Sequence, residues 1–266
     1  MVELFKAILA ILQFFVGASV FSFVNVVAWR LPRGMKFLND HSRCPACGAR
    51  LALPDLIPVA SWLALHGRCR HCGAAIAPRY LLMELAGGAL ALLCTARFGF
   101  SAAGLFGFSW AALAALAFVA LLVCIALIDA ETQLIPDRLN LAVALCGAAA
   151  VFAMPGLRLT DRLIGALCVS VPMFLLCLAV PGGFGGGDIK LMAAAGLFLG
   201  WRLTLLAAFL AILGGGGYGA YLLLAKKADR KAHFAFGPFL CAGMGAALFA
   251  GEGLLAWYFQ FFTFQR

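Results

Sequence analysis

The sequence predicts an all-α polytopic membrane protein of about eight transmembrane helices, with a cytoplasmic loop domain after the first helix. Of its 266 residues, 65% are hydrophobic and only 12% are charged, whereas soluble domains are about half apolar and about a quarter charged. Apolar runs long enough to cross a bilayer recur along the chain. Helices are expected because, in lipid, every backbone polar group must be satisfied within its own segment.

The apolar runs give the order of the expected spans, which are 4–29, 80–97, 104–127, 138–154, 161–180, 189–200, 203–225 and 235–250. The first is expected to be a retained helix rather than a cleaved signal peptide, because it opens with Glu3 beside Lys6 and stays apolar to Trp29. The tail from 252 to 264 extends the last span or lies in the membrane interface. The expected division is a first helix at 1–29, a loop domain at 30–79 and a membrane core at 80–266.

Basic residues set the expected orientation in the membrane. The loop 30–79 carries eight Lys and Arg residues against two acids, and a second basic loop lies at 225–233. Because cytoplasmic loops are enriched in Lys and Arg, both loops are expected in the cytoplasm and both termini in the periplasm. Arg158 and Arg162 are then exceptions on the outer side. The net charge of +9 is accounted for by membrane orientation and contact with lipid, so no nucleic-acid partner is expected.

Two aspartates stand out at the expected cytoplasmic edge of the membrane. Asp129 lies in LIDAETQLIPDRLN, and Asp188 follows the glycines of GGFGGGDIKLMAAAG. Carboxylates near hydrocarbon are costly and are kept mostly where they work. Two that lie together share a proton, so that one can activate water while the other polarises a carbonyl group. Gly185 and Gly187 would let a substrate backbone approach closely.

Other roles for these residues are open from the sequence alone. A Gly-rich turn followed by Asp188 is also an ordinary helix start with an aspartate cap. Lys190 is either a supporting residue of the site or a cytoplasmic anchor for its span. The residues by themselves leave three carboxylates as the possible partner of Asp188, namely Asp129, Glu131 and Asp137.

The loop 30–79 contains two matching cysteine motifs, CPACG and CRHCG. Cys44, Cys47, Cys69 and Cys72 therefore form two C-x-x-C pairs, the pattern of a four-thiolate zinc site. Four cysteines leave no open coordination position, so the zinc is expected to be structural and to fold a small loop domain. His71 as a replacement ligand and dithiol redox chemistry are the alternatives.

Three segments carry a resemblance to a known family. GGGDIKLMAAAGLFLGW resembles the GxGD motif of the type IV prepilin peptidases, which are intramembrane aspartic proteases, IDAETQLIPDRL resembles their other aspartate motif, and FSFVNVVAWRLPRG resembles their N-terminal signature. The resemblance runs from about residue 15 to the 220s. It implies that Asp129 and Asp188 form the catalytic dyad and that Asp137 belongs to a helix start. Phe21 departs from the family pattern, which usually has glycine there.

The resemblance implies two activities. One is removal of the leader peptide of type IV prepilins and pseudoprepilins at the cytoplasmic face of the bacterial inner membrane. The other is N-methylation of the new N-terminus with S-adenosylmethionine, since the zinc loop is typical of the bifunctional members. Gly67 matches a glycine that the family associates with methyl transfer. Glu84 either serves the same reaction by facing a substrate amine or pairs with Arg79.

Alternative functions are a peptidase without methyl transfer, a membrane transporter and a dithiol oxidoreductase. The transporter is disfavoured because its carboxylates would be expected near the bilayer midplane. The oxidoreductase leaves both aspartates unexplained. The stretch GGGGYG at 214–219 is interpreted as close helix packing rather than phosphate binding, because no strand precedes it.

Overall fold

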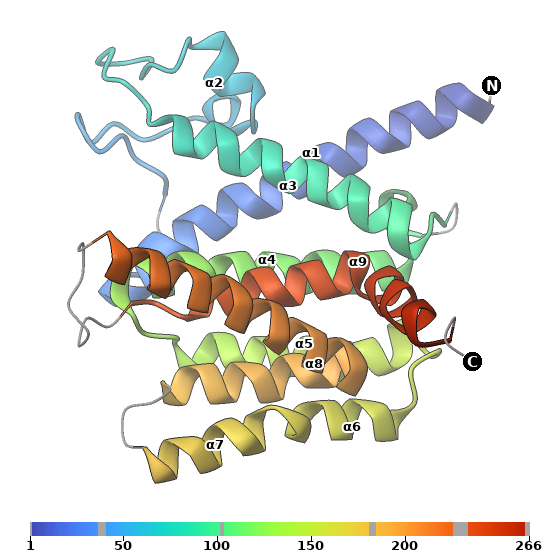
Figure 1. Ribbon diagram of the computed structural model, residues 1–266. Coiled ribbons are helices and arrows are strands. Elements are labelled where there is room, and N and C mark those ends of the chain that lie inside the picture. The colour runs from blue at the N-terminus through green and yellow to red at the C-terminus, as the bar shows by residue number, and fades with distance from the viewer. Residues whose placement is uncertain (1, 37–40, 102–103, 181–184, 226–233, 264–266) are drawn as a thin grey trace. The chain divides into compact units, whose positions relative to one another are not determined.

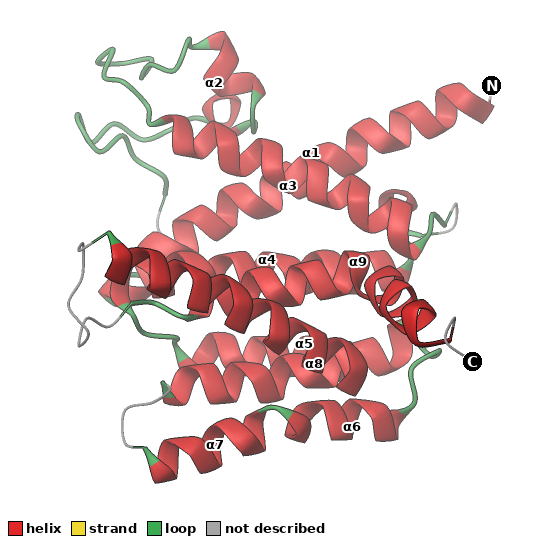
Figure 2. Ribbon diagram, viewed as in Figure 1, coloured by secondary structure: helices red, strands yellow, loops and turns green. Residues whose placement is uncertain are grey.

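The computed structural model describes residues 2–36, 41–101, 104–180, 185–225 and 234–263. Every regular element in these ranges is a helix (Figure 2), which confirms the predicted all-helical fold. The chain forms two compact units, residues 1–120 and 121–266, and the boundary falls within helix α4 (Trp110–Thr132). The second basic loop, 226–233, lies outside the described residues.

The first unit is built on two long helices, α1 (Val2–Arg30) and α3 (Pro78–Phe98), which pack against each other. Glycines set their close approach, because a Cβ atom on Gly17 would lie 2.3 Å from the carbonyl oxygen of Gly87. Phe21, the residue that departs from the family pattern, is 1% exposed, and its Cβ would lie 2.5 Å from a Cβ on Gly87. The large Phe21 side chain is thus accommodated by a glycine on the facing helix.

Short elements separate α1 from α3 in the zinc-loop region. They are the 3₁₀ helices η1 (Leu31–Arg33) and η2 (Leu53–Leu56) and the helix α2 (Ala60–Ala64). A third 3₁₀ helix, η3 (Leu105–Gly107), precedes α4. The carbonyl oxygen of Phe106 in η3 accepts a hydrogen bond from the buried amide of Gln13 at 3.1 Å. A polar side chain inside α1 is therefore satisfied, as an apolar environment demands.

The second unit contains the end of α4 and helices α5 (Asp137–Ala153), α6 (Leu159–Cys168), α7 (Ser170–Ala179), α8 (Gly186–Leu224) and α9 (Gly237–Thr263). α8 is not one continuous rod, since Gly200 has non-helical backbone angles of φ 73° and ψ 167°. Figure 1 shows α8, in orange, reversing direction along its length. The expected spans 189–200 and 203–225 are the two arms of this hairpin.

Among the described residues, six helical segments are long and apolar enough to cross a membrane, counting α8 as one and α6 joined to α7 as another. α5, which covers the expected span 138–154, has 17 residues. All eight predicted apolar segments are therefore helical in the described part of the chain. The difference from the expected eight spans arises because one hairpin is a single element and α5 is short.

Arg162 lies inside the second unit and is 1% exposed. Its guanidinium group donates hydrogen bonds to the carbonyl oxygens of Ala150 and Met154 at the end of α5, at 2.8 and 2.9 Å. It also donates to those of Leu197 and Phe198, at 2.9 and 3.3 Å, just before the break at Gly200. The negative ends of two helices therefore stabilise this cation. One of the two exceptions to the charge rule is thus an internal structural residue.

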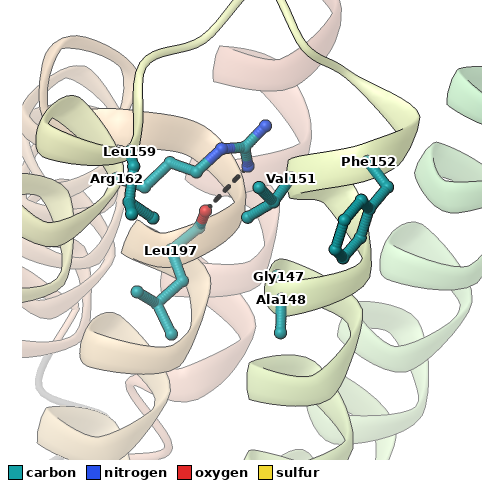
Figure 3. Close-up of a pocket in the computed structure, with 7 residues that line it drawn as sticks. All are labelled: Gly147, Ala148, Val151, Phe152, Leu159, Arg162 and Leu197. Carbon is teal, nitrogen blue, oxygen red and sulfur yellow. Dashed lines mark hydrogen bonds between the residues drawn. The ribbon is translucent and has the colours of Figure 1, made fainter.

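A cavity of about 300 Å³ lies beside Arg162 (Figure 3). Its walls are almost entirely apolar and come from α5, α6 and α8; the lining residues are Gly147, Ala148, Val151, Phe152, Leu159, Arg162 and Leu197. Leu197 is nine residues beyond Asp188, about 14 Å along the helix. This cavity is therefore separate from the aspartates described below.

Candidate active site and metal centre

The four cysteines of the loop converge on one point within the first unit. The Sγ atoms of Cys44, Cys47, Cys69 and Cys72 all lie within 4.8 Å of one another, and those of Cys44 and Cys72 are 3.9 Å apart. Four sulfurs bound tetrahedrally to zinc at about 2.3 Å would be about 3.8 Å apart. The cluster therefore fits a structural zinc ion with only a small contraction.

The two cysteine motifs fold into equivalent turns. In the first, the N–H of Gly48 donates to the carbonyl oxygen of Cys44 at 2.9 Å; in the second, Gly73 donates to Cys69 at the same distance. Both glycines have positive φ, 71° and 70°, a conformation that other residues rarely adopt. The glycine after each C-x-x-C pair is thus required by the turn that presents the two sulfurs.

Backbone N–H groups favour the thiolate form of the first cysteine of each motif, whereas burial and the neighbouring cysteine sulfurs raise the pKa of Cys72 to about 11. The N–H groups of Cys47 and Ala46 lower the pKa of the Cys44 thiol to about 6. Those of Cys72 and His71 lower the pKa of Cys69. Because zinc binds the thiolate form, this favours metal binding near neutral pH. In the described chain, this is the one cluster of metal-ligand type that was found.

Gly67 lies in the turn that leads into the second cysteine motif. Its φ is 66°, and a Cβ atom there would lie 2.7 Å from the ring of Trp62. Its N–H and carbonyl group bond to Trp62 and Ile76, at 2.9 and 2.7 Å. These contacts give Gly67 a structural reason to be glycine, whatever part it has in methyl transfer.

Glu84 is buried near the start of α3, at 8% exposure, and its Oε2 accepts the N–H of Val59 at 2.7 Å. Val59 has φ 64° and ψ −53°, the conformation of a strained γ-turn that β-branched residues avoid. A charge-assisted hydrogen bond from α3 therefore holds an unfavourable turn in the zinc loop.

The two aspartate motifs pack together within the second unit, although they are far apart in sequence. The end of α4 and the starts of α5, α8 and α9 gather at one end of the unit, on the left of Figure 1. Asp129, on the last turns of α4, is 5% exposed. Asp188 lies in the first turn of α8 and is partly exposed.

The segment before Asp188 is held by the start of α5. The carbonyl oxygen of Gly187 accepts a long hydrogen bond of 3.4 Å from the buried amide of Asn140. A Cβ on Gly187 would lie 2.9 Å from that of Ile135, so this glycine allows the two aspartate motifs to approach. Gly185 is the backbone cap of α8, and its carbonyl oxygen accepts the N–H of Asp188 at 3.1 Å.

The other acidic candidates lie elsewhere. Asp137 forms an ion pair with Lys190, with 2.8 Å between Oδ1 and Nζ, and both side chains are largely exposed. Glu131 is exposed. Lys190 therefore joins the two aspartate motifs at the surface, and of the candidates Asp129, Glu131 and Asp137 only Asp129 is buried.

Sequence reasoning missed one residue at this site. Gly237, the first residue of α9, donates its N–H to Oδ2 of Asp129 at 2.9 Å. The two residues are 108 positions apart, and the sequence around Gly237, AFGPF, contains no acid, base or metal ligand. The two phenylalanines that flank glycine and proline in this segment are the one sequence feature that could have drawn attention to it.

Chemically, the arrangement is a pair of carboxyl groups at the edge of a helical membrane unit. One ionised carboxylate can take a proton from water while a protonated partner polarises a carbonyl group, without a covalent intermediate. Of the described glycines just before Asp188, Gly186 is the one at which a Cβ atom would meet nothing within 4 Å. Such a pair of carboxyl groups has the chemistry of an aspartic peptidase.

Comparison with known proteins agrees with this chemistry. Residues 15–98 match the bacterial peptidase A24 N-terminal domain, and residues 116–220 match the type IV leader peptidase family. No solved structure matches the chain.

Curated relatives are similar over nearly their whole length. A protein of Stutzerimonas stutzeri is 34% identical over 273 residues, covering 92% of each chain. One from Burkholderia pseudomallei (strain K96243) is 35% identical, covering 88% of this chain and 83% of its own. One from Bacillus subtilis (strain 168) is 32% identical, covering 93% and 96%. Each is named prepilin leader peptidase/N-methyltransferase. With the paired aspartates and the cysteine cluster, this similarity shows that the chain belongs to the type IV leader peptidase family.

Proposed function

We propose that the protein is a membrane aspartic endopeptidase that removes the leader peptide of type IV prepilins and pseudoprepilins, and then N-methylates the new N-terminal residue. The observation that carries the peptidase assignment is the packing of the two aspartate motifs at one end of the second unit, where Gly187 meets Ile135 and Lys190 pairs with Asp137. The methyl-transfer assignment is supported by the names of the relatives and by the cysteine cluster, which is typical of the bifunctional members.

In the proposed mechanism, Asp129 and Asp188 hold a water molecule between them. The ionised member of the pair takes a proton from the water as it attacks the scissile carbonyl carbon. The protonated member donates a hydrogen bond to the carbonyl oxygen, where negative charge develops. The tetrahedral intermediate then collapses: the C–N bond breaks, and the leaving amine takes the proton that the ionised member had removed from the water. Because the carboxyl groups titrate as a pair, the proton belongs to the dyad rather than to one residue.

The proposed orientation places the dyad and the zinc loop at the cytoplasmic face of the bacterial inner membrane, with both termini in the periplasm. It is supported by the eight basic residues of the loop 30–79. A prepilin would lie in the same membrane with its leader in the cytoplasm, so that the scissile bond meets the dyad at the membrane edge. The basic surface of the loop is suited to anionic lipid headgroups.

Zinc, held by Cys44, Cys47, Cys69 and Cys72, is proposed to fold the loop and to take no part in peptide cleavage. S-adenosylmethionine is the proposed methyl donor, and it would supply an electrophilic methyl group to the new amine. Gly67 and Glu84 are proposed to serve methyl transfer. Their contacts with Trp62 and Val59 suggest that they do so by shaping the loop.

The decisive experiment measures the mass of a purified pilin precursor after incubation with the protein and S-adenosylmethionine. Loss of the leader together with one added methyl group supports both activities. Asp129→Asn and Asp188→Asn should each abolish cleavage, whereas Glu252→Gln, at an exposed carboxylate of α9, should cleave normally. Cleavage by Asp188→Asn at the wild-type rate would refute the aspartate mechanism. Leader loss without methylation would leave a peptidase only, and no change with several precursors would favour a transporter.

A further inference from the structure

The start of α9 is fitted closely around Asp129. Besides donating its N–H to Oδ2 of Asp129 at 2.9 Å, Gly237 leaves no space for a side chain. A Cβ atom there would lie 2.6 Å from Oδ2 and 2.9 Å from Cγ of the same carboxyl group. A glycine is needed here because of the space that the carboxylate occupies, since Gly237 is not among the residues with positive φ.

The rings of Phe236 and Phe239, which flank Gly237 in the sequence, pack against the second arm of α8. The ring of Phe236 covers Gly215, where a Cβ would lie 2.7 Å from Cε2. Phe239 packs on the ring of Tyr218 with a centroid distance of 5.5 Å, and its Cδ1 would lie 3.3 Å from a Cβ on Gly214.

These contacts account for the stretch GGGGYG at 214–219. Gly214, Gly215 and Gly219 each face a ring of the segment 234–239. Because these glycines have no side chains, the aromatic rings can pack directly against the helix backbone. By contrast, a Cβ on Gly216 or Gly217 would meet nothing within 4 Å. The stretch was expected to allow close helix packing, and the structure identifies what packs there: the segment that contains Gly237.

We propose that Gly237 is a positioning residue for Asp129, and that the aromatic contacts of 234–239 with 214–219 hold Gly237 in place. The N–H of Gly237 donates a hydrogen bond to Oδ2 of Asp129. In this proposal, Oδ1 of Asp129 is the oxygen that faces the attacking water. A carboxylate with one fixed oxygen cannot rotate freely, which keeps the dyad in its reactive geometry. This inference rests on the proposed peptidase function, with Asp129 as a member of the dyad.

The first test compares Gly237→Ala with Gly245→Ala, a glycine in the same helix where a Cβ meets nothing within 4 Å. Gly237→Ala must displace the carboxylate by several tenths of an ångström or more. The expected result is a fall in kcat for leader removal of about 100-fold, with KM for the prepilin within about twofold of wild type. Gly245→Ala should match wild type in both constants.

The second test changes the contact between Gly215 and the ring of Phe236. Gly215→Val should push Phe236 away and lower kcat by about tenfold, whereas the matched variant Gly216→Val should have no effect. Because both changes act through the position of Asp129, Gly237→Ala combined with Gly215→Val should lose clearly less than the product of the two single effects.

Folding is followed by zinc content, thermal unfolding and methylation of a pilin whose leader has already been removed. Wild-type kcat in Gly237→Ala, or a kcat for Gly215→Val no lower than for Gly216→Val, would overturn the inference. If Gly237→Ala does not fold, glycolic acid incorporated at position 237 removes the N–H without adding an atom. It should lower kcat by at least about tenfold, and full activity would refute the role. Failure of the wild-type protein to cleave any prepilin would instead overturn the peptidase assignment on which the inference depends.

Discussion

Removal of zinc should unfold the cysteine loop while the membrane helices stay folded. Among the described residues of 31–77, only Cys44, Gly67 and Cys69 are buried. Even if each cysteine contributed as much as a fully buried Val or Leu, about 1.5–3 kcal/mol, the pair would supply roughly 3–6 kcal/mol. Structural zinc binding to small domains contributes about 10–16 kcal/mol. The metal is therefore the larger stabilising contribution, and without it the loop has almost no apolar core.

The assay is limited digestion with trypsin, followed by mass spectrometry. Arg50, Arg68 and Arg70 are exposed trypsin sites within the loop, and all are expected to resist cleavage while the two cysteine turns are folded. Chelation of zinc, or Cys47→Ser, should speed cleavage at these sites at least about 100-fold, because a loss of a few kcal/mol already raises the unfolded population by this factor.

Two controls separate the metal from other causes. Added zinc should restore resistance to the chelated protein but only partly to Cys47→Ser. Cys177→Ser, at a cysteine in α7 outside the cluster, should digest like wild type. If the zinc-free loop proved as resistant as the zinc-loaded one, the reasoning from its missing core would be refuted.

Three further predictions follow from polar contacts elsewhere in the protein. Arg162→Leu removes four hydrogen bonds and should destabilise the second unit by about 2–3 kcal/mol, at about 0.6 kcal/mol for each bond within a membrane; unchanged unfolding in detergent would contradict this. Asp137→Lys and Lys190→Asp should each change stability by less than about 1 kcal/mol, because both side chains are largely exposed, and the double exchange should return stability to wild type in thermal unfolding. Asp55→Asn should make the zinc loop more sensitive to trypsin at pH 7. The hydrogen bond from Arg70 lowers the pKa of Asp55 below its usual 3.8. The stability that this ion pair contributes is therefore complete above pH 3.8 and is lost only as the pH falls through the lowered pKa. Equal trypsin sensitivity of wild type and variant at pH 7 would contradict this prediction.

The sequence was most informative where a short segment determines its own structure. Each C-x-x-C-G motif forms a local turn, so both the ligands and the need for Gly48 and Gly73 could be read directly from spacing. Apolar runs likewise predicted the membrane helices of the described residues, because burial in lipid imposes a strong and continuous composition.

Long-range contacts of ordinary residues were beyond such reasoning. Gly237 touches Asp129 through a backbone N–H, which leaves no trace in residue type. Arg162 was expected on the outer side as an exception to the charge rule, but it lies inside the protein, where it donates hydrogen bonds to four backbone carbonyl groups. Both depend on where separate helices end relative to each other, and the sequence pattern alone does not contain that information.

The break at Gly200 has a consequence for the surrounding membrane. The arm that begins at Gly186 and carries Asp188 has only fourteen residues before the break, about 21 Å of helix. α5, with 17 residues, is about 26 Å long. The hydrocarbon core of a bilayer is about 30 Å thick, so these helices are too short to match it. Thinning of the adjacent lipid is one response to such short helices, and it would bring the aqueous phase toward a hydrolytic reaction that consumes water.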